Sequence, residues 1–102
     1  MGALTPLGND ISSTWTSLLA GRSGIAPITQ FDTTDFASTI AGEVKDFSCD
    51  PWISKKEARK MDRFIHLAIA AADMCVQDSG LDLPGDQDPE RVGVIVGAGL
   101  GG

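Results

Sequence analysis

The chain has 102 residues and a formal net charge of −6 at pH 7, with 42% hydrophobic and 22% charged residues. A chain of this length forms one domain at most, and its composition is that of a soluble globular protein. No apolar run approaches the roughly 20 residues that span a bilayer, and the N-terminus lacks the basic and apolar segments of a secretory signal, so we expect a cytoplasmic protein without a membrane segment.

Few residues are available for a catalytic or metal centre. The chain has two cysteines, Cys49 and Cys75, and one histidine, His66, which form neither a CxxC pair nor a metal-ligand spacing. Acidic neighbours at Asp46 and Asp50 disfavour a thiolate at Cys49. The sequence therefore predicts no catalytic residue and no metal site in this chain.

The first predicted element is a short helix after the turn-like segment TPLGND. Asn9 or Asp10 suits the N-cap, and Gly21 ends the helical pattern. Apolar residues recur at the i, i+4, i+7 and i+8 positions of one stripe, which comprises Ile11, Trp15, Leu18 and Leu19. The two tryptophans, Trp15 and Trp52, are interpreted as packing anchors.

The region of residues 26–53 is less regular. Pro27 and the Asp/Thr cluster of residues 32–35 mark turns. A short strand is predicted over residues 38–44, with Gly42 as an interruption.

The second predicted helix is the clearest element. Ser54 and Glu57 form a capping box, in which two side chains satisfy exposed N–H groups at the helix start. The helical period continues through Asp78, and Ser79 and Gly80 supply the stop. The predicted core face consists of Met61, Phe64, Ile65, Ala68, Ala72, Cys75 and Val76.

The opposite face of this helix carries most of the positive charge. Five of the eight Lys and Arg residues lie between residues 55 and 63, in an arc of about 140°. His66 projects into the same arc and is interpreted as a surface histidine. The five cations are Lys55, Lys56, Arg59, Lys60 and Arg63.

Three interpretations fit this cluster: a solvated helix face, a nucleic-acid contact, or a docking site for a small acidic protein. A chain of net charge −6 repels phosphate over most of its surface, which argues against nucleic acid. A cluster of one sign also steers an oppositely charged partner and fixes its register. Composition alone leaves the solvated face and the docking site equally open.

The C-terminal region, residues 91–102, predicts a strand and a glycine-rich turn. The apolar run RVGVIVG is typical of a strand buried on both faces in an α/β layered fold. The following GAGLGG matches GxGxxG, but no helix or acidic residue follows it, so a tight turn is favoured over a nucleotide site. A helix that leads into a buried strand without partner strands predicts a chain cut at its C-terminal end.

Several motifs together resemble the opening section of the β-ketoacyl-acyl carrier protein synthases, and most of all the type II enzymes that elongate fatty acids. They are GALTPLGND, STWTSLLAGRSGI, FDTTDFASTIAGEVKDF, SKKEARKMDRF, QDSG and VIVGAGLGG, which cover essentially the whole chain. The resemblance implies an α/β fold, namely part of the first half of a thiolase-like layered fold with a mixed sheet and packed helices. Family members begin with an earlier strand and continue further, so residues 1–102 are expected to be a partial N-terminal domain truncated at both ends.

The chemistry that the resemblance implies is a decarboxylating Claisen condensation in fatty acid elongation. An acyl group moves from the phosphopantetheine of acyl carrier protein to a cysteine, and malonyl-carrier loses carbon dioxide and attacks the thioester. No other cofactor and no metal is implied, and the parent enzyme is expected to be a homodimer. The family's nucleophile lies in an Ala-Cys-Thr/Ser motif that neither Cys49 nor Cys75 shares, so this chain alone is expected to be inactive.

Two sites carry over from the family. The basic stretch matches the docking site for acyl carrier protein, a small acidic partner, with Lys55, Arg59 and Lys60 as the main contacts and Lys56 and Arg63 as secondary ones. Leu100, flanked by Gly99 and Gly101, matches an apolar residue beside the acyl pocket.

Two other functions stay open at this point. One is a stand-alone module that binds acyl carrier protein without catalysis. The other is a non-condensing relative such as a polyketide chain-length factor, which shares the fold but not the nucleophile.

Overall fold

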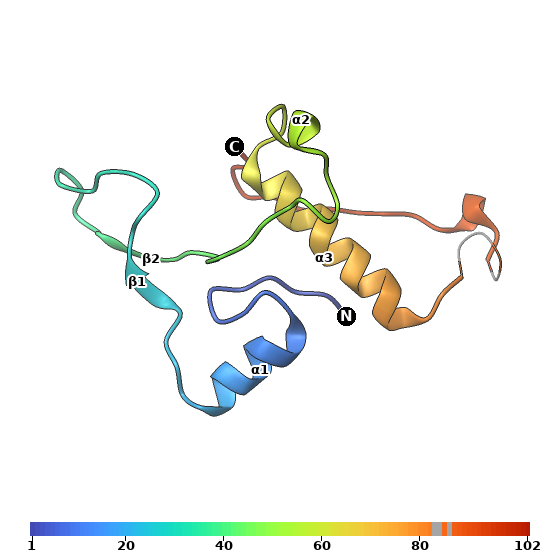
Figure 1. The fold of residues 1–102 in the computed structure, drawn as a ribbon, viewed down its shortest axis with the longest axis horizontal. Helices are drawn as coiled ribbons and strands as arrows, with labels where there is room; N and C mark the ends of the chain where they lie inside the picture. Colours follow the sequence, from blue (N-terminus) through green and yellow to red (C-terminus); the bar gives the residue numbers. More distant parts are fainter. Residues whose placement is uncertain (83–84, 86) are drawn as a thin grey trace. The chain divides into compact units, whose positions relative to one another are not determined.

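The computed structural model describes residues 1–82, 85 and 87–102, in which the contacts form two compact units. One unit is Ala3–Phe47, and the other combines Met1–Gly2 with Ser48–Gly102. The element order is α1 (Ile11–Leu19), β1 (Ile25–Pro27), β2 (Ile40–Gly42), α2 (Lys55–Ala58), α3 (Arg63–Ser79) and the 3₁₀ turn η1 (Pro89–Arg91) (Figure 1).

Helix α1 begins and ends where the sequence predicts. Asp10 is the N-cap, and its Oδ1 accepts hydrogen bonds from the Ser13 backbone N–H and from Ser13 Oγ, both at 2.7 Å. These bonds satisfy a donor at the helix start that has no partner within the helix. Gly21 follows the helix with a positive φ of 65°, a conformation that glycine adopts without strain.

The apolar stripe of α1 is exposed, whereas the polar side makes the contacts. Trp15 is 59% exposed, so its interpretation as a packing anchor is wrong for this structure. Ser17 is buried, and its Oγ donates to the Leu7 carbonyl at 3.0 Å. The hydroxyls of Thr5 and Thr14 lie 2.9 Å apart in a hydrogen bond. Hydrogen bonds to the preceding turn therefore hold α1 in its unit.

Strands β1 and β2 form an antiparallel pair in which Ile25 opposes Gly42 and Pro27 opposes Ile40. The predicted strand of residues 38–44 is confirmed in the narrower range of β2, but its partner β1 was not predicted. A side-chain contact supports the pair, because the Glu43 carboxylate accepts from Thr29 Oγ1 at 2.8 Å and from its backbone N–H.

The prediction of one continuous helix from residue 54 to residue 78 is wrong, because the chain breaks between α2 and α3. Asp62 has an extended ψ of 156° and acts as the N-cap of α3. The Asp62 carboxylate makes no hydrogen bond to the start of α3, so the break consists of its extended backbone and of the turn before it. The N–H groups of Lys60 and Met61 instead bond to Glu57 and Ala58 in tightened turns.

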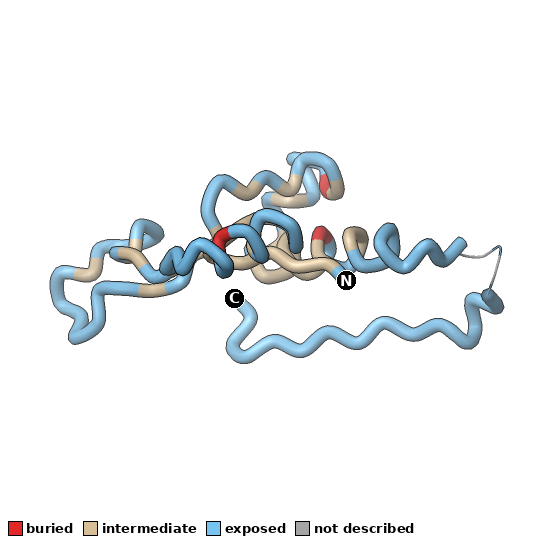
Figure 2. The backbone as a smooth tube through the Cα atoms, turned by 90° about the horizontal axis from the view of Figure 1, so that it is seen from below, coloured by how far each residue is buried: buried red, intermediate tan, exposed pale blue. Residues whose placement is uncertain are grey.

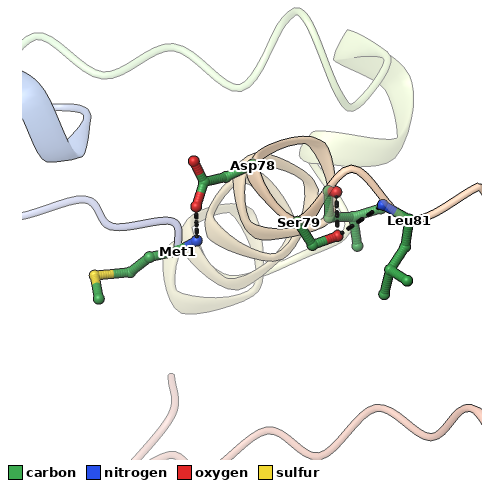
Figure 3. A network of polar contacts seen from close by, with 5 residues as sticks. Met1, Asp78, Ser79 and Leu81 are labelled. Carbon is green, nitrogen blue, oxygen red and sulfur yellow. Dashed lines mark hydrogen bonds and ion pairs between the residues drawn. The ribbon is translucent and has the colours of Figure 1, made fainter.

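Helix α3 ends at the predicted stop. Gly80 is in the left-handed region with φ 68°, and the Ser79 hydroxyl links the Val76 carbonyl to the Leu81 N–H (Figure 3). The Met1 ammonium pairs with Asp78 on the last turn, and this contact raises the pKa of the amino group (Figure 3).

The predicted core face of α3 is only partly covered. Ala70 was not among the predicted core residues, yet it is fully buried, and Ile53 before α2 is 5% exposed. Most of the tube in Figure 2 is coloured as exposed. Ala72, Cys75 and Val76, which were expected in the core, are exposed. The contacts of α3 within its unit therefore lie on the side of Ala70, and much of the apolar stripe stays open.

The predicted buried strand after Arg91 is not formed in this structure. Residues 92–97 have no strand assignment, and Ile95 is 98% exposed. A strand needs a neighbouring backbone to complete its hydrogen bonds. Among residues 1–82, 85 and 87–102, only the three-residue strands β1 and β2 form a sheet. None of the described helices is long and apolar enough to cross a membrane.

Replacing Gly80 should destabilise the stop of α3. The substitution Gly80→Ala places a Cβ on a residue with φ 68°, at a cost of roughly 1–2 kcal/mol. Urea unfolding measures this loss, and Gly80→Asn is the matched control because asparagine tolerates the left-handed region. Equal stability of the alanine and asparagine variants would contradict the assigned conformation.

The cap of α1 predicts a pH response. The Ser13 backbone N–H, and secondly its hydroxyl, hold the pKa of Asp10 below its ordinary value of 3.8. A lowered folded-state pKa means that the cap stabilises α1 fully above pH 3.8 and that this contribution is lost as pH falls through the lower, folded value. A carbon-13 NMR titration should give a midpoint below 3.8 that stays lowered in Ser13→Ala. A midpoint at or above 3.8 would refute the cap.

Candidate functional site

The basic segment, residues 55–63, presents all five of its cations to solvent. Lys55 and Lys56 lie on α2, Arg59 and Lys60 lie in the connection, and Arg63 begins α3. The cations therefore do not share one face of a single helix as predicted. Their exposure on the surface of one short stretch is confirmed.

Four of these cations are available to a partner. Among the residues that the structure describes, Lys55, Lys56, Arg59 and Lys60 have no ion-pair partner. In contrast, the Met1 ammonium pairs with the Asp78 carboxylate. The neighbouring Glu57 carboxylate accepts instead from Ser54 Oγ at 2.9 Å. Lys55, Lys56, Arg59 and Lys60 thus concentrate positive charge within six residues.

The start of the basic segment is fixed by a cap and by a contact to α3. Ser54 Oγ accepts from the Glu57 N–H at 3.3 Å, which confirms the predicted N-cap, although Glu57 bonds the Ser54 hydroxyl rather than its N–H. Two residues earlier, Trp52 Nε1 donates to Asp73 Oδ2 at 2.8 Å. The same oxygen accepts from Gln77 Nε2 at 2.7 Å. Figure 1 shows the segment before α2 running beside α3.

The end of α2 is held by His66, which was interpreted as a surface histidine. Its Nε2 lies 3.1 Å from the Ala58 carbonyl oxygen, and the residue is half-buried. A carbonyl only accepts hydrogen bonds, so Nε2 carries the proton. Sequence reasoning missed this role and that of Asp73, because both contacts depend on the break at Asp62. The i, i+4 spacing of Asp73 and Gln77 on α3 was the available signal.

The glycine-rich turn lies at the start of α3, close to the basic segment. Gly101 has a φ of 79°, and a Cβ placed there would lie 3.4 Å from the Phe64 ring. Leu100 is fully exposed. The role of Leu100, Gly99 and Gly101 beside an acyl pocket stays a prediction.

An apolar groove of about 300 Å³ runs along α3 beside the extended C-terminal stretch. Phe64, Ile65 and Ala68 line it from the helix, and Val94 and Val96 line it from the extended stretch. Residues predicted as core and residues predicted as a buried strand therefore line the same groove, although no strand forms.

Metal chemistry finds no support in the described residues, among which no group of three or more His, Cys, Asp and Glu side chains could hold an ion. Cys49 is half-buried and Cys75 is exposed, and both are free thiols. The histidine that could serve as a base is bonded to a backbone carbonyl.

Comparisons with known proteins identify the family. The family model described as "Beta-ketoacyl synthase, N-terminal domain" matches residues 1–102. The 3-oxoacyl-[acyl-carrier-protein] synthase 2 of Vibrio cholerae is 50% identical over this whole chain, and that of Staphylococcus aureus strain N315 is 48% identical. The chain spans 24% of the length of each of these relatives.

A solved structure shows the same fold. The ishigamide ketosynthase/chain length factor is 41% identical and superimposes with a TM-score of 0.69. The match covers 79% of this chain and 20% of that one. The prediction of a thiolase-like α/β fold is confirmed by this likeness together with the family match.

The cap at Ser54 predicts the local stability of α2. The substitution Ser54→Ala removes the acceptor of the Glu57 N–H and should cost about 1 kcal/mol. Hydrogen exchange of that amide should then be about fivefold faster. Ser54→Thr is the control that keeps the hydroxyl, and unchanged exchange in the alanine variant would show that the cap is unimportant.

Proposed function

The chain belongs to the β-ketoacyl synthase family, and on that basis we propose that it is the N-terminal part of a 3-oxoacyl-[acyl-carrier-protein] synthase. The parent enzyme would condense an acyl thioester with malonyl-acyl carrier protein in fatty acid elongation, with loss of carbon dioxide. Relatives of that name match the chain from end to end, which supports the proposal. They are about four times longer, so the remainder of the enzyme would complete the active site.

The contribution of this chain would be to receive the acyl carrier protein. The observation that carries this proposal is the exposed basic segment, whose Lys55, Lys56, Arg59 and Lys60 have no ion-pair partner among the described residues. An acidic partner would be steered to these charges over a distance of about 10 Å at 0.1 M salt. Lys55, Arg59 and Lys60 would carry most of the contact, and Lys56 and Arg63 would add to it.

Catalysis would depend on residues outside this chain. Neither Cys49 nor Cys75 has the Ala-Cys-Thr/Ser context of a condensing nucleophile, and Cys49 lies between acidic neighbours. Acyl groups would arrive on the phosphopantetheine of the carrier, without another cofactor. Leu100, between Gly99 and Gly101, would line the acyl pocket once the remaining chain surrounds it.

The apolar groove along α3 supports a larger parent protein. Its lining by Phe64, Ile65 and Val94 leaves apolar surface open to water, which further parts of the parent protein would cover. The parent enzyme would be a cytoplasmic homodimer.

A second candidate is a non-condensing chain-length factor. The match to the ishigamide ketosynthase/chain length factor supports this candidate, because that protein's name includes both functions. A peptide map of the natural gene product separates the two functions. An Ala-Cys-Thr/Ser peptide would favour a condensing enzyme, and a replaced cysteine in that position would favour a chain-length factor.

Reversing the three main cations should weaken carrier binding. The substitutions Lys55→Glu, Arg59→Glu and Lys60→Glu each remove an exposed contact of about 0–1 kcal/mol, so together they should raise the Kd up to about a hundredfold at low salt. Isothermal titration of the natural gene product with its acyl carrier protein measures this change. The difference should vanish near 1 M salt, where the screening length is about 3 Å.

A control of equal net charge is available within the chain. Reversal of the other three cations, Arg22, Lys45 and Arg91, changes the total charge by the same amount. This control should leave the Kd nearly unchanged. Equal weakening by both triple variants would show a general charge effect, and no weakening by either would remove the docking proposal.

A further inference from the structure

We propose that Trp52 and His66 are positioning residues for carrier docking, because their hydrogen bonds join the chain just before α2 and the last residue of α2 to α3. This inference rests on the proposed docking function and adds two residues that carry no part of the charge. The tie at the start of α2 is the hydrogen bond from Trp52 to Asp73. The tie at the end of α2 is the hydrogen bond from His66 to Ala58.

Helix α2 needs such ties because it cannot hold its own shape. It has four residues, whereas isolated helices shorter than about 12–15 residues are marginal in water. Lys55, Lys56, Arg59 and Lys60 lie within six residues of the chain. Like charges held this close together repel each other. The segment would therefore open without contacts from outside it.

The tie at the start is a charge-assisted hydrogen bond in a half-buried setting. Trp52 and Asp73 are both half-buried, and their bond of 2.8 Å joins an indole N–H to a carboxylate. Hydrogen bonds to an ionised acceptor are about twice as strong as neutral ones. Gln77, one turn further along α3, donates to the same Asp73 oxygen and so fixes the carboxylate.

At the end of α2, His66 gives the Ala58 carbonyl a second hydrogen-bond donor. The Ala58 oxygen accepts from the Met61 N–H at 3.3 Å and from His66 Nε2 at 3.1 Å. His66 is the fourth residue of α3, and Arg59 directly follows Ala58. The imidazole therefore fixes the point from which Arg59 and Lys60 project.

Ordering the segment before the carrier arrives improves binding. Side chains and backbone that are already fixed lose less conformational entropy when the complex forms. Loss of either tie leaves all five cations in place but lets them spread over many arrangements. The expected result is an increase in the Kd for acyl carrier protein of about threefold to tenfold.

The test uses the natural gene product with Trp52→Phe and His66→Ala as the two variants. Trp52→Phe keeps an aromatic ring and removes the N–H, and His66→Ala removes the donor to Ala58. Two measurements are made on each: the Kd for acyl carrier protein at low salt, and the KM for one acyl group presented on the carrier and on free pantetheine. We expect the Kd and the carrier KM to rise while the pantetheine KM stays unchanged.

Two further variants serve as matched controls. Asp73→Asn keeps an oxygen acceptor for Trp52, and His66→Gln keeps a donor of similar reach for Ala58. Both should restore most of the affinity for the carrier. In contrast, Asp73→Leu should resemble Trp52→Phe.

The possible results separate this inference from the docking proposal. If Trp52→Phe and His66→Ala leave the Kd unchanged while the triple charge reversal of Lys55, Arg59 and Lys60 weakens binding, docking stands and the positioning role is overturned. If both kinds of substrate are affected equally, the residues serve general folding and the inference is overturned. If the charge reversal also has no effect, the docking proposal fails together with the inference.

Discussion

Repulsion among clustered cations is the constraint on which the arrangement of this chain depends. Five of eight cations lie within nine residues, on the four-residue helix α2, on its connection to α3 and at the first residue of α3. Among the described residues, the bonds that hold α2 and the chain before it involve none of the side chains of Lys55, Lys56, Arg59 and Lys60. They are a serine cap, an indole bonded to a carboxylate and an imidazole bonded to a carbonyl. Such contacts fix the backbone and leave the positive charge available to a partner.

Local signals in the sequence predicted the parts of the fold that depend on neighbouring residues. Asp10, Ser54 and Gly80 lie at helix boundaries where their side chains or conformational freedom satisfy the backbone. The exposure of the basic segment was predicted because the segment is rich in Lys and Arg. These features persist because each is stabilised within a few residues of sequence.

Features that need distant partners were predicted less well. The break at Asp62 interrupts a strong helical period, and the Asp62 carboxylate makes no cap hydrogen bond that the sequence could have signalled. The apolar run after Gly93 predicts a buried strand, but strands require a neighbouring backbone, and its Ile95 is exposed. The roles of His66 and Asp73 depend on the fold around the break, so they became visible only in three dimensions.

The central claim is that the basic segment receives an acidic carrier in a member of the β-ketoacyl synthase family. Site-specific photo-crosslinking of the natural gene product to its acyl carrier protein tests this claim most directly, with the reactive group at position 60 and, for reference, at the exposed position 22. The account predicts a crosslink from position 60 to an acidic helix of the carrier that disappears in high salt, and none from position 22. A crosslink at position 22 alone, or equal yields at both positions, would contradict it.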